Sequence, residues 1–202
     1  MDRRLRHFLD AVRGATLTVA DGSTPHASAG TPLIAQPQSP GLLARLSYGA
    51  GGQSSAMRTG TLGIGLPLST LSNATGGLSF EDFQAGQVDA YRAAHRSATG
   101  TGGQGHGVAH DPPDPAAVGP RRLRHLLERD AQRRRDNGTP GAPPMHFGRV
   151  YAGDPDEIVA GLAADTALRA ADEVVVALPF DHRPEVSQRI VGTVARTVLP
   201  GL

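Results

Sequence analysis

The chain has 202 residues, including 26 Gly and 16 Pro, and aromatic residues make up only 4% of it, so large core-filling rings are scarce. This length excludes a complete eightfold β/α barrel, which takes about 250 residues. The formal net charge of +1 excludes a strong electrostatic attraction of the whole chain to nucleic acid or membranes. The absence of cysteine excludes disulfides, thiolate metal sites and cysteine nucleophiles.

The first third of the chain predicts one helix, a loop and two short strands. Apolar residues at helical spacing over 3–13 predict an amphipathic helix. Residues 20–41 are rich in Gly, Ser, Thr and Pro and predict a loop. Short apolar runs at 42–48 and 62–68 predict two buried strands, with a short helix over 57–60 between them.

The middle of the chain changes character at residue 96. Residues 69–78 predict a polar loop, and 79–95 predict a helix that Ser79 caps, with Asp82 at its third position. In 99–120, by contrast, 10 of 22 residues are Gly or Pro. Because burial cannot repay the backbone entropy of such a tract, we expect an irregular segment over 96–146 with no strand in it.

Regular structure is predicted again from residue 147 onward. Residues 147–151 predict a strand, and Asp154 followed by Pro155 is typical of a helix start. A buried strand over 173–178 and a last helix over 184–199 follow. The alternation of strands and helices predicts an α/β protein with parallel strands. We therefore divide the chain into three segments: 1–95, 96–146 and 147–202.

Two features of the sequence bear on where the protein works. The N-terminus is basic but has no apolar run long enough for a signal peptide. The longest apolar stretch, 174–178, is too short to cross a bilayer. We expect a cytoplasmic protein with no membrane partner.

The glycine-rich turn at 49–55 is the best candidate site. Glycines let the backbone approach a phosphate closely, and consecutive N–H groups at the start of a helix attract anions. Ser54 and Ser55 add hydroxyl donors. The alternative is a tight turn with no ligand, in a chain rich in glycine throughout. A second glycine set, Gly60, Gly63 and Gly65, is not a dinucleotide fingerprint, since Leu68 stands where the third glycine belongs.

Other candidate groups are weaker. His106 and His110, with Asp111, have a spacing that holds a metal on a helix, but their glycine-rich surroundings favour a solvated loop. An isolated histidine can act as a base only with a partner, which the sequence does not identify for three of them: His95, His146 and His182.

The arginine-rich segment 121–135 is a candidate for binding nucleic acid. It carries seven Arg against Glu128 and Asp130, and such a cluster can contact phosphates. No aromatic residue lies between the arginines to stack on bases, so a solvated helix face is the simpler interpretation.

Several segments together resemble the luciferase-like flavin-dependent monooxygenases. They are YGAGGQSSAMRTGTLGIGLPLSTL (48–71), FEDFQAGQVDAYRAAH (80–95), GRVYAGDPDEIVAGLAADTALRAADEVVVALPFD (148–181), RIVGTVARTVLPGL (189–202) and RLRHFLDAVRG (4–14). The order and spacing of these segments are also similar to that family. The resemblance covers about two-thirds of the chain and corresponds to the second half of the family's barrel.

The resemblance implies a fold, a cofactor and a reaction. The fold is an incomplete β/α barrel of the TIM type, interrupted by the Gly/Pro-rich segment. The cofactor is reduced FMN or the deazaflavin F420, and the reaction oxygenates a small organic substrate, with a flavin reductase as partner. The implied phosphate-binding residues are Gly51, Gly52, Gln53, Ser54 and Ser55; no catalytic residue and no metal ligand is implied.

Two other functions remain open at this point. The family has a strand between the helix at 80–95 and the strand at 147–151, whereas here we expect none, and the first half of the barrel is not matched. The chain is therefore alternatively a non-catalytic half barrel that needs a partner, either a second copy or a complementing N-terminal half. The remaining alternative is nucleic-acid binding through the arginine-rich segment.

Overall fold

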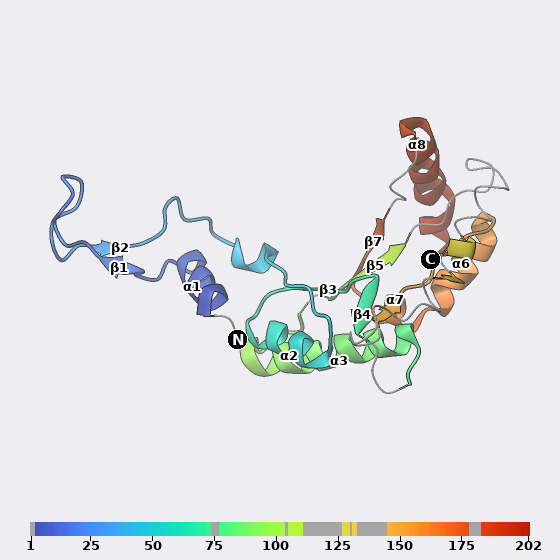
Figure 1. Cartoon of the computed structure of the whole chain (residues 1–202), viewed down its shortest axis with the longest axis horizontal. Coiled ribbons are helices and arrows are strands. Elements are labelled where there is room, and N and C mark those ends of the chain that lie inside the picture. The colour runs from blue at the N-terminus through green and yellow to red at the C-terminus, as the bar shows by residue number, and fades with distance from the viewer. Residues whose placement is uncertain are drawn as a thin grey trace. The chain divides into compact units, whose positions relative to one another are not determined.

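The computed structural model shows a mixed α/β protein (Figure 1). The chain divides into two compact units, Met1–Leu46 and Ser47–Leu202, which we call the N-terminal and C-terminal units. Among the described residues, no helix combines the length and the apolar character needed to span a membrane. The structure describes residues 3–73, 77–103, 105–110, 127–129, 131–132, 145–177 and 183–202.

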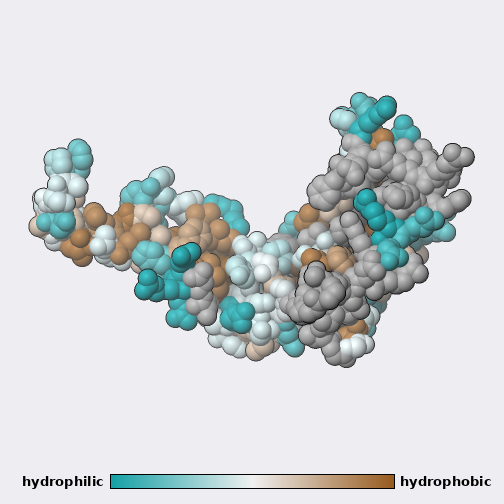
Figure 2. All heavy atoms as spheres, viewed as in Figure 1, coloured by the Kyte–Doolittle hydropathy of each residue, from teal (hydrophilic) through white to brown (hydrophobic). Residues whose placement is uncertain are grey.

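In its described residues, the N-terminal unit contains an α-helix and a short hairpin, followed by a turn of 3-10 helix. Helix α1 (Arg3–Val12) confirms the predicted amphipathic helix and buries Leu9 completely. Strands β1 (Thr18–Val19) and β2 (Pro32–Leu33) pair antiparallel, within the region predicted as loop. Figure 2 shows brown, apolar surface along this unit, where large hydrophobic residues are exposed: Phe8, Val19, Leu33 and Ile34.

The predicted strand over 42–48 is wrong for most of its length. Its first part forms the short 3-10 helix η1 (Leu43–Arg45), and Ser47 makes only an isolated parallel bridge to Gly65. The apolar residues of such a short run fit a helical turn as well as a strand. The second predicted strand, over 62–68, is reduced to β3 (Leu66–Pro67).

A parallel sheet forms the centre of the C-terminal unit. Strand β5 (Gly105–His110) lies between β3 and β7 (Glu173–Ala177), parallel to both. The bridge from Ser47 to Gly65 adds a fourth parallel segment beside β3. The parallel segments therefore follow one another in space in the same order as in the sequence, starting with Ser47.

Helices connect the successive parallel segments. Helix α2 (Gln53–Thr61) precedes β3, and α3 (Phe80–Thr99) lies between β3 and β5. Helices α6 (Pro155–Ala164) and α7 (Thr166–Ala170) precede β7, and α8 (Pro184–Thr193) follows it and continues in irregular helical turns to Gly201. The α/β alternation predicted from the sequence is confirmed.

Two helix starts were predicted from local sequence and are confirmed. The Ser79 hydroxyl accepts a hydrogen bond from the Asp82 N–H at 3.0 Å and caps α3. The Asp154 carboxylate caps α6 by accepting from the Glu157 N–H at 3.1 Å. Helix α3 continues past the predicted end at residue 95 and ends at Gly100, whose left-handed conformation (φ 77°) favours glycine.

The absence of a strand from 96–146 was a wrong prediction. Strand β5 lies inside this segment and is the central strand of the sheet. Its sequence, GHGVAH, has one β-branched residue, so local preference is weak. Hydrogen bonding to a neighbouring strand on each side outweighs that preference. Residues 111–126, which include Asp111 and several of the arginines, lie outside the described residues.

The sequence did not predict the two-stranded sheet of the C-terminal unit. Strand β4 (Leu71–Asn73) lies in the predicted polar loop and pairs antiparallel with β6 (Met145–Phe147). The predicted strand over 147–151 therefore overlaps β6 at Phe147 alone.

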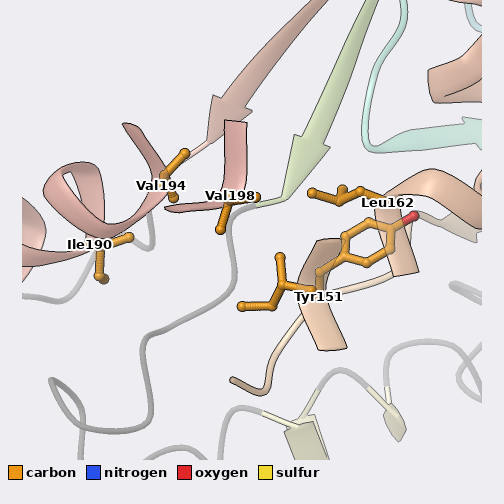
Figure 3. Close-up of a cluster of buried hydrophobic side chains, with 6 residues drawn as sticks. Tyr151, Leu162, Ile190, Val194 and Val198 are labelled. Carbon is orange, nitrogen blue, oxygen red and sulfur yellow. The ribbon is translucent and has the colours of Figure 1, made fainter. Parts of the chain in front are cut away.

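Two apolar clusters support the C-terminal unit. One lies between α2, α3 and β3 and includes Leu66, Val88 and Tyr91. The other joins Tyr151 and α6 to the C-terminal helical segment, as the labelled side chains in Figure 3 show. In both clusters the helices cover one face of the parallel sheet. Val174 and Val176 of β7 pack into the second cluster, whereas Val175 between them is 46% exposed.

Candidate functional site

The glycine-rich turn lies at the carboxyl end of the first parallel segment. The Tyr48 N–H donates to the Gly65 carbonyl at 2.9 Å, which holds this segment beside the residue before β3. The chain then passes through Gly49, buried Ala50 and Gly51 and enters α2 directly. The turn therefore connects the carboxyl end of a parallel strand position to a helix N-terminus, the arrangement that binds phosphate in many α/β proteins.

The five predicted binding residues occupy successive positions of this helix start. Gly52 is the N-cap, and Gln53, Ser54 and Ser55 are the first three helical residues. The Ser55 hydroxyl donates to the Gly52 carbonyl at 2.7 Å and accepts from the Gly52 N–H at 3.1 Å. The Ser55 hydroxyl thus stabilises the helix start, and the Ser54 hydroxyl is the one left on the exposed side.

At the helix start, from Gly51 to Ala56, three backbone donors have no hydrogen-bond acceptor in the described part of the chain. They are the N–H groups of Gly51, Gln53 and Ser54, while the Ser55 and Ala56 N–H groups donate to the Gly52 carbonyl. The first N–H groups of a helix also carry the positive end of its dipole. An anion at this position would receive several hydrogen bonds without displacing an internal one.

The fold does not require glycine at positions 49 and 52 of this turn. None of the turn's glycines has a positive φ, and Gly52 is fully extended at −168°. A Cβ atom built on Gly49 or Gly52 would meet no atom within 4 Å. Neither backbone strain nor packing therefore explains these glycines, whereas the missing side chains leave room for a ligand to reach the N–H groups.

Helix α3 holds the loops around the turn through polar side chains. The Gln84 amide donates to the Ser69 carbonyl at 2.5 Å, and the Tyr91 hydroxyl donates to the Ile64 carbonyl at 3.0 Å. Between them, the Gln87 amide nitrogen lies 3.5 Å from the Ala50 carbonyl oxygen in the turn. Burial, and then the charge of Asp172, raise the pKa of Tyr91, so this phenol stays a donor at neutral pH.

Gln87 leaves one buried group without a partner. The side chain is 1% exposed, and its Oε1 makes no hydrogen bond. Buried polar atoms are seldom left unpaired in folded proteins. Sequence reasoning gave Gln87 no role. A polar residue one turn from Gln84 and Tyr91 on an inward face was the signal available.

No protein-family model matches this sequence, and a search of curated proteins gives no match either.

The glycines of the second set have structural roles. A Cβ on Gly60 would lie 2.5 Å from the Tyr91 carbonyl oxygen and 2.9 Å from the backbone nitrogen of His95, so this glycine permits α2 and α3 to approach closely. Gly63 has a left-handed φ of 71° after the end of α2.

The histidine candidates in the described part of the chain lie on α3, β5 and β6 rather than in the turn. His95 lies near the C-terminal end of α3, which leads into β5, and its Nδ1 is 2.9 Å from the Thr101 carbonyl oxygen. His106 and His110 lie on strand β5. Positions four apart on a strand are separated by about 13 Å, too far to share a metal ion. His146 lies on β6, and His182 lies outside the described residues.

A hollow of about 630 Å³ lies beside α6, and no residue of the turn lines it. Glu81, Arg149, Glu157 and Tyr151 line part of it. The Tyr151 hydroxyl donates to Asp165, whose other carboxylate oxygen caps α7 by accepting from the N–H groups of Ala167 and Leu168. Burial and the bond to Asp165 raise the pKa of Tyr151. These groups connect two helices and a loop, which is a structural role.

The turn presents backbone N–H groups and a serine hydroxyl rather than charged side chains. Residues 49–56 include no ionisable side chain. Within the described residues, moreover, no cluster of three side chains is arranged to hold a metal ion.

Proposed function

We propose that this chain binds the phosphate of a reduced flavin, FMN or F420, at residues 51–55. In this proposal it acts in the cytoplasm in a luciferase-like, flavin-dependent oxidation of a small organic substrate. The observation that carries the proposal is the turn of open N–H groups that leads from a parallel strand position into α2. Flavin is chosen over other phosphate esters because of the resemblance of residues 48–71 and 148–181 to that enzyme family.

The topology of the sheet supports a partial β/α barrel as the fold behind this function. The parallel segments at Ser47, β3, β5 and β7 are adjacent in sequence order, with helices between them. A barrel has this sequential order, whereas a doubly wound sheet reverses its strand order. Barrel enzymes bind phosphate beyond the carboxyl ends of their strands, which is where the turn lies.

The chain's own residues would hold the phosphate through its backbone. The N–H groups of Gly51, Gln53 and Ser54 would donate to phosphate oxygens, and the Ser54 hydroxyl adds a fourth donor. Gly49 and Gly52 leave space for the approach. The flavin, when bound, supplies the electrons that reduce oxygen for transfer to the substrate. We assign no catalytic residue, and a flavin reductase is the partner that the reaction would require.

A titration of the purified full chain tests this function. FMN, anaerobically reduced FMN and F420 are added in turn, and binding is followed by flavin fluorescence and by calorimetry. We expect submillimolar affinity for at least one of them, in competition with inorganic phosphate. If none binds below millimolar concentration, either alone or with a complementing N-terminal half barrel, the flavin proposal is refuted.

The second candidate is a half barrel without catalytic activity that requires a partner chain. Strand β7 pairs only with β5 among the described residues, and its Val175 is 46% exposed. Such an edge is a template for pairing with another strand. Sedimentation of the chain, alone and with a co-expressed complementing half, tests this candidate. A monomer that does not associate with that half refutes it.

A further inference from the structure

The orientation of the glycine-rich turn depends on a side chain from another helix. Gln87 lies on α3, 37 residues along the chain from Ala50, and its amide nitrogen is 3.5 Å from the Ala50 carbonyl oxygen. Ala50 is only 4% exposed, so few other donors can reach this carbonyl. At this length the contact is at the long end of hydrogen-bond geometry, and within the described residues it links a side chain of α3 directly to the turn.

The planarity of the peptide bond links this contact to the anion site. The carbonyl of Ala50 and the N–H of Gly51 belong to the same planar, trans peptide and point in opposite directions. Because Gln87 draws the carbonyl toward α3, the Gly51 N–H points away from α3, toward the exposed side of the turn. If the peptide turned over, this donor would face the buried side instead.

We propose that Gln87 is a positioning residue for anion binding: by holding the Ala50 carbonyl, it aims the Gly51 N–H at the phosphate. This inference rests on the proposed function, because it names the residue that prepares the phosphate site. Gln87 does not touch the ligand. Its unpaired Oε1, which is buried beside the turn, marks a polar side chain kept in the core for its donor.

Two substitutions of Gln87 separate the donor from the volume of the side chain. Gln87→Met keeps a flexible chain of similar size but removes the donor, and it should weaken FMN binding about tenfold at every pH, the effect of losing roughly one hydrogen bond. Gln87→Glu can donate only when its carboxyl is protonated. Its dissociation constant relative to wild type should therefore be near one at pH 5 and rise about tenfold by pH 8.

Gln84 provides the matched control on the same helix. It makes the same kind of bond, to the Ser69 carbonyl outside the turn. The ratio of dissociation constants for Gln84→Glu should not change with pH. Dividing by the wild-type value at each pH removes the titration of the phosphate itself from the comparison.

A second measurement decides the inference without any ligand. In a ¹H–¹⁵N NMR titration, the Gly51 amide resonance should move with the carboxyl titration in Gln87→Glu and stay in place in Gln84→Glu. If wild type binds no flavin, the proposed function fails, and this resonance still tests Gln87. A Gly51 resonance that does not follow the titration, or Gln87 variants that bind FMN as wild type does, overturns the inference.

Discussion

Placing a single negative charge at the start of α2 should abolish most anion binding without unfolding the chain. Gly52 is the N-cap of this helix, its backbone is extended, and a Cβ there meets no atom within 4 Å. Aspartate and asparagine both fit this position and are both preferred N-cap residues. We expect Gly52→Asp and Gly52→Asn to change the free energy of unfolding by only a few tenths of a kcal/mol, about the difference measured between such caps and glycine.

The two variants differ in charge but hardly in shape, so their difference isolates electrostatics. Two unit charges 4 Å apart repel by about 1 kcal/mol in water and by about 4 kcal/mol at an effective dielectric constant of 20. Gly51, Gln53 and Ser54 are exposed, so the lower part of this range applies. We therefore expect FMN to bind Gly52→Asp roughly tenfold more weakly than Gly52→Asn at low salt, equivalent to about 1.4 kcal/mol.

Flavin fluorescence titration at low and high salt measures this difference. Near 1 M salt the Debye length falls to about 3 Å, and the two variants should bind with similar affinity. Both variants compete for the helix N–H groups, so both should bind more weakly than wild type. If Gly52→Asp binds FMN as well as Gly52→Asn does at low salt, the phosphate does not lie at the N-terminus of α2.

Three further predictions concern the residues around the site. Gly60→Ala should lower the free energy of unfolding by about 2 kcal/mol or more, because its Cβ would lie 2.5 Å from a backbone oxygen, whereas Gly86→Ala, whose Cβ meets nothing within 4 Å, should raise it by up to about 1 kcal/mol. Urea unfolding compares the two variants, and equal effects would contradict the close approach of α2 and α3. Asp165→Ala removes the acceptor for the N–H groups of α7 and for the Tyr151 hydroxyl, so its unfolding free energy should fall by about 2 kcal/mol; a loss under 0.5 kcal/mol would refute this role. The folded state raises the pKa of Tyr151 and so holds this proton more tightly than the unfolded state does; the contribution of Tyr151 to stability should be full below pH 10 and be lost above it. The free energy of unfolding of Tyr151→Phe should fall less steeply with pH in the same unfolding series, and an identical slope against pH would exclude Tyr151 as the cause.

The helix starts show how far local sequence reaches. The caps at Ser79 and Asp154 depend on residues three positions apart, and both form as predicted. Helix α2 begins earlier than predicted because Gly52 and Ser55 form a reciprocal cap that does not match the usual Ser/Thr-to-Glu pattern. Local hydrogen bonds therefore determine where helices begin, and an unusual pair of residues is enough to hide one.

The strands show where local sequence fails. Strand β5 is hydrogen bonded to β3 and to β7, which lie about 40 and 65 residues away in the sequence. The run from 42 to 48 was predicted as a strand and forms only one bridge, at Ser47. Strand formation depends on partners that the sequence does not specify locally. The same reason explains why β4 and β6 were not predicted, since these two strands pair although the middle of the chain separates them in the sequence.

The candidate site divides along the same line. The sequence by itself determined the glycine-rich turn, its missing side chains and the serine that follows, because backbone freedom and helix capping depend on residues within a few positions of one another. Only the tertiary structure decided that Ser47, just before the turn, pairs with Gly65, and that Gln87 reaches the Ala50 carbonyl. The physical reason is that such contacts form when segments far apart in the chain pack together, and only the folded backbone brings them within hydrogen-bonding distance.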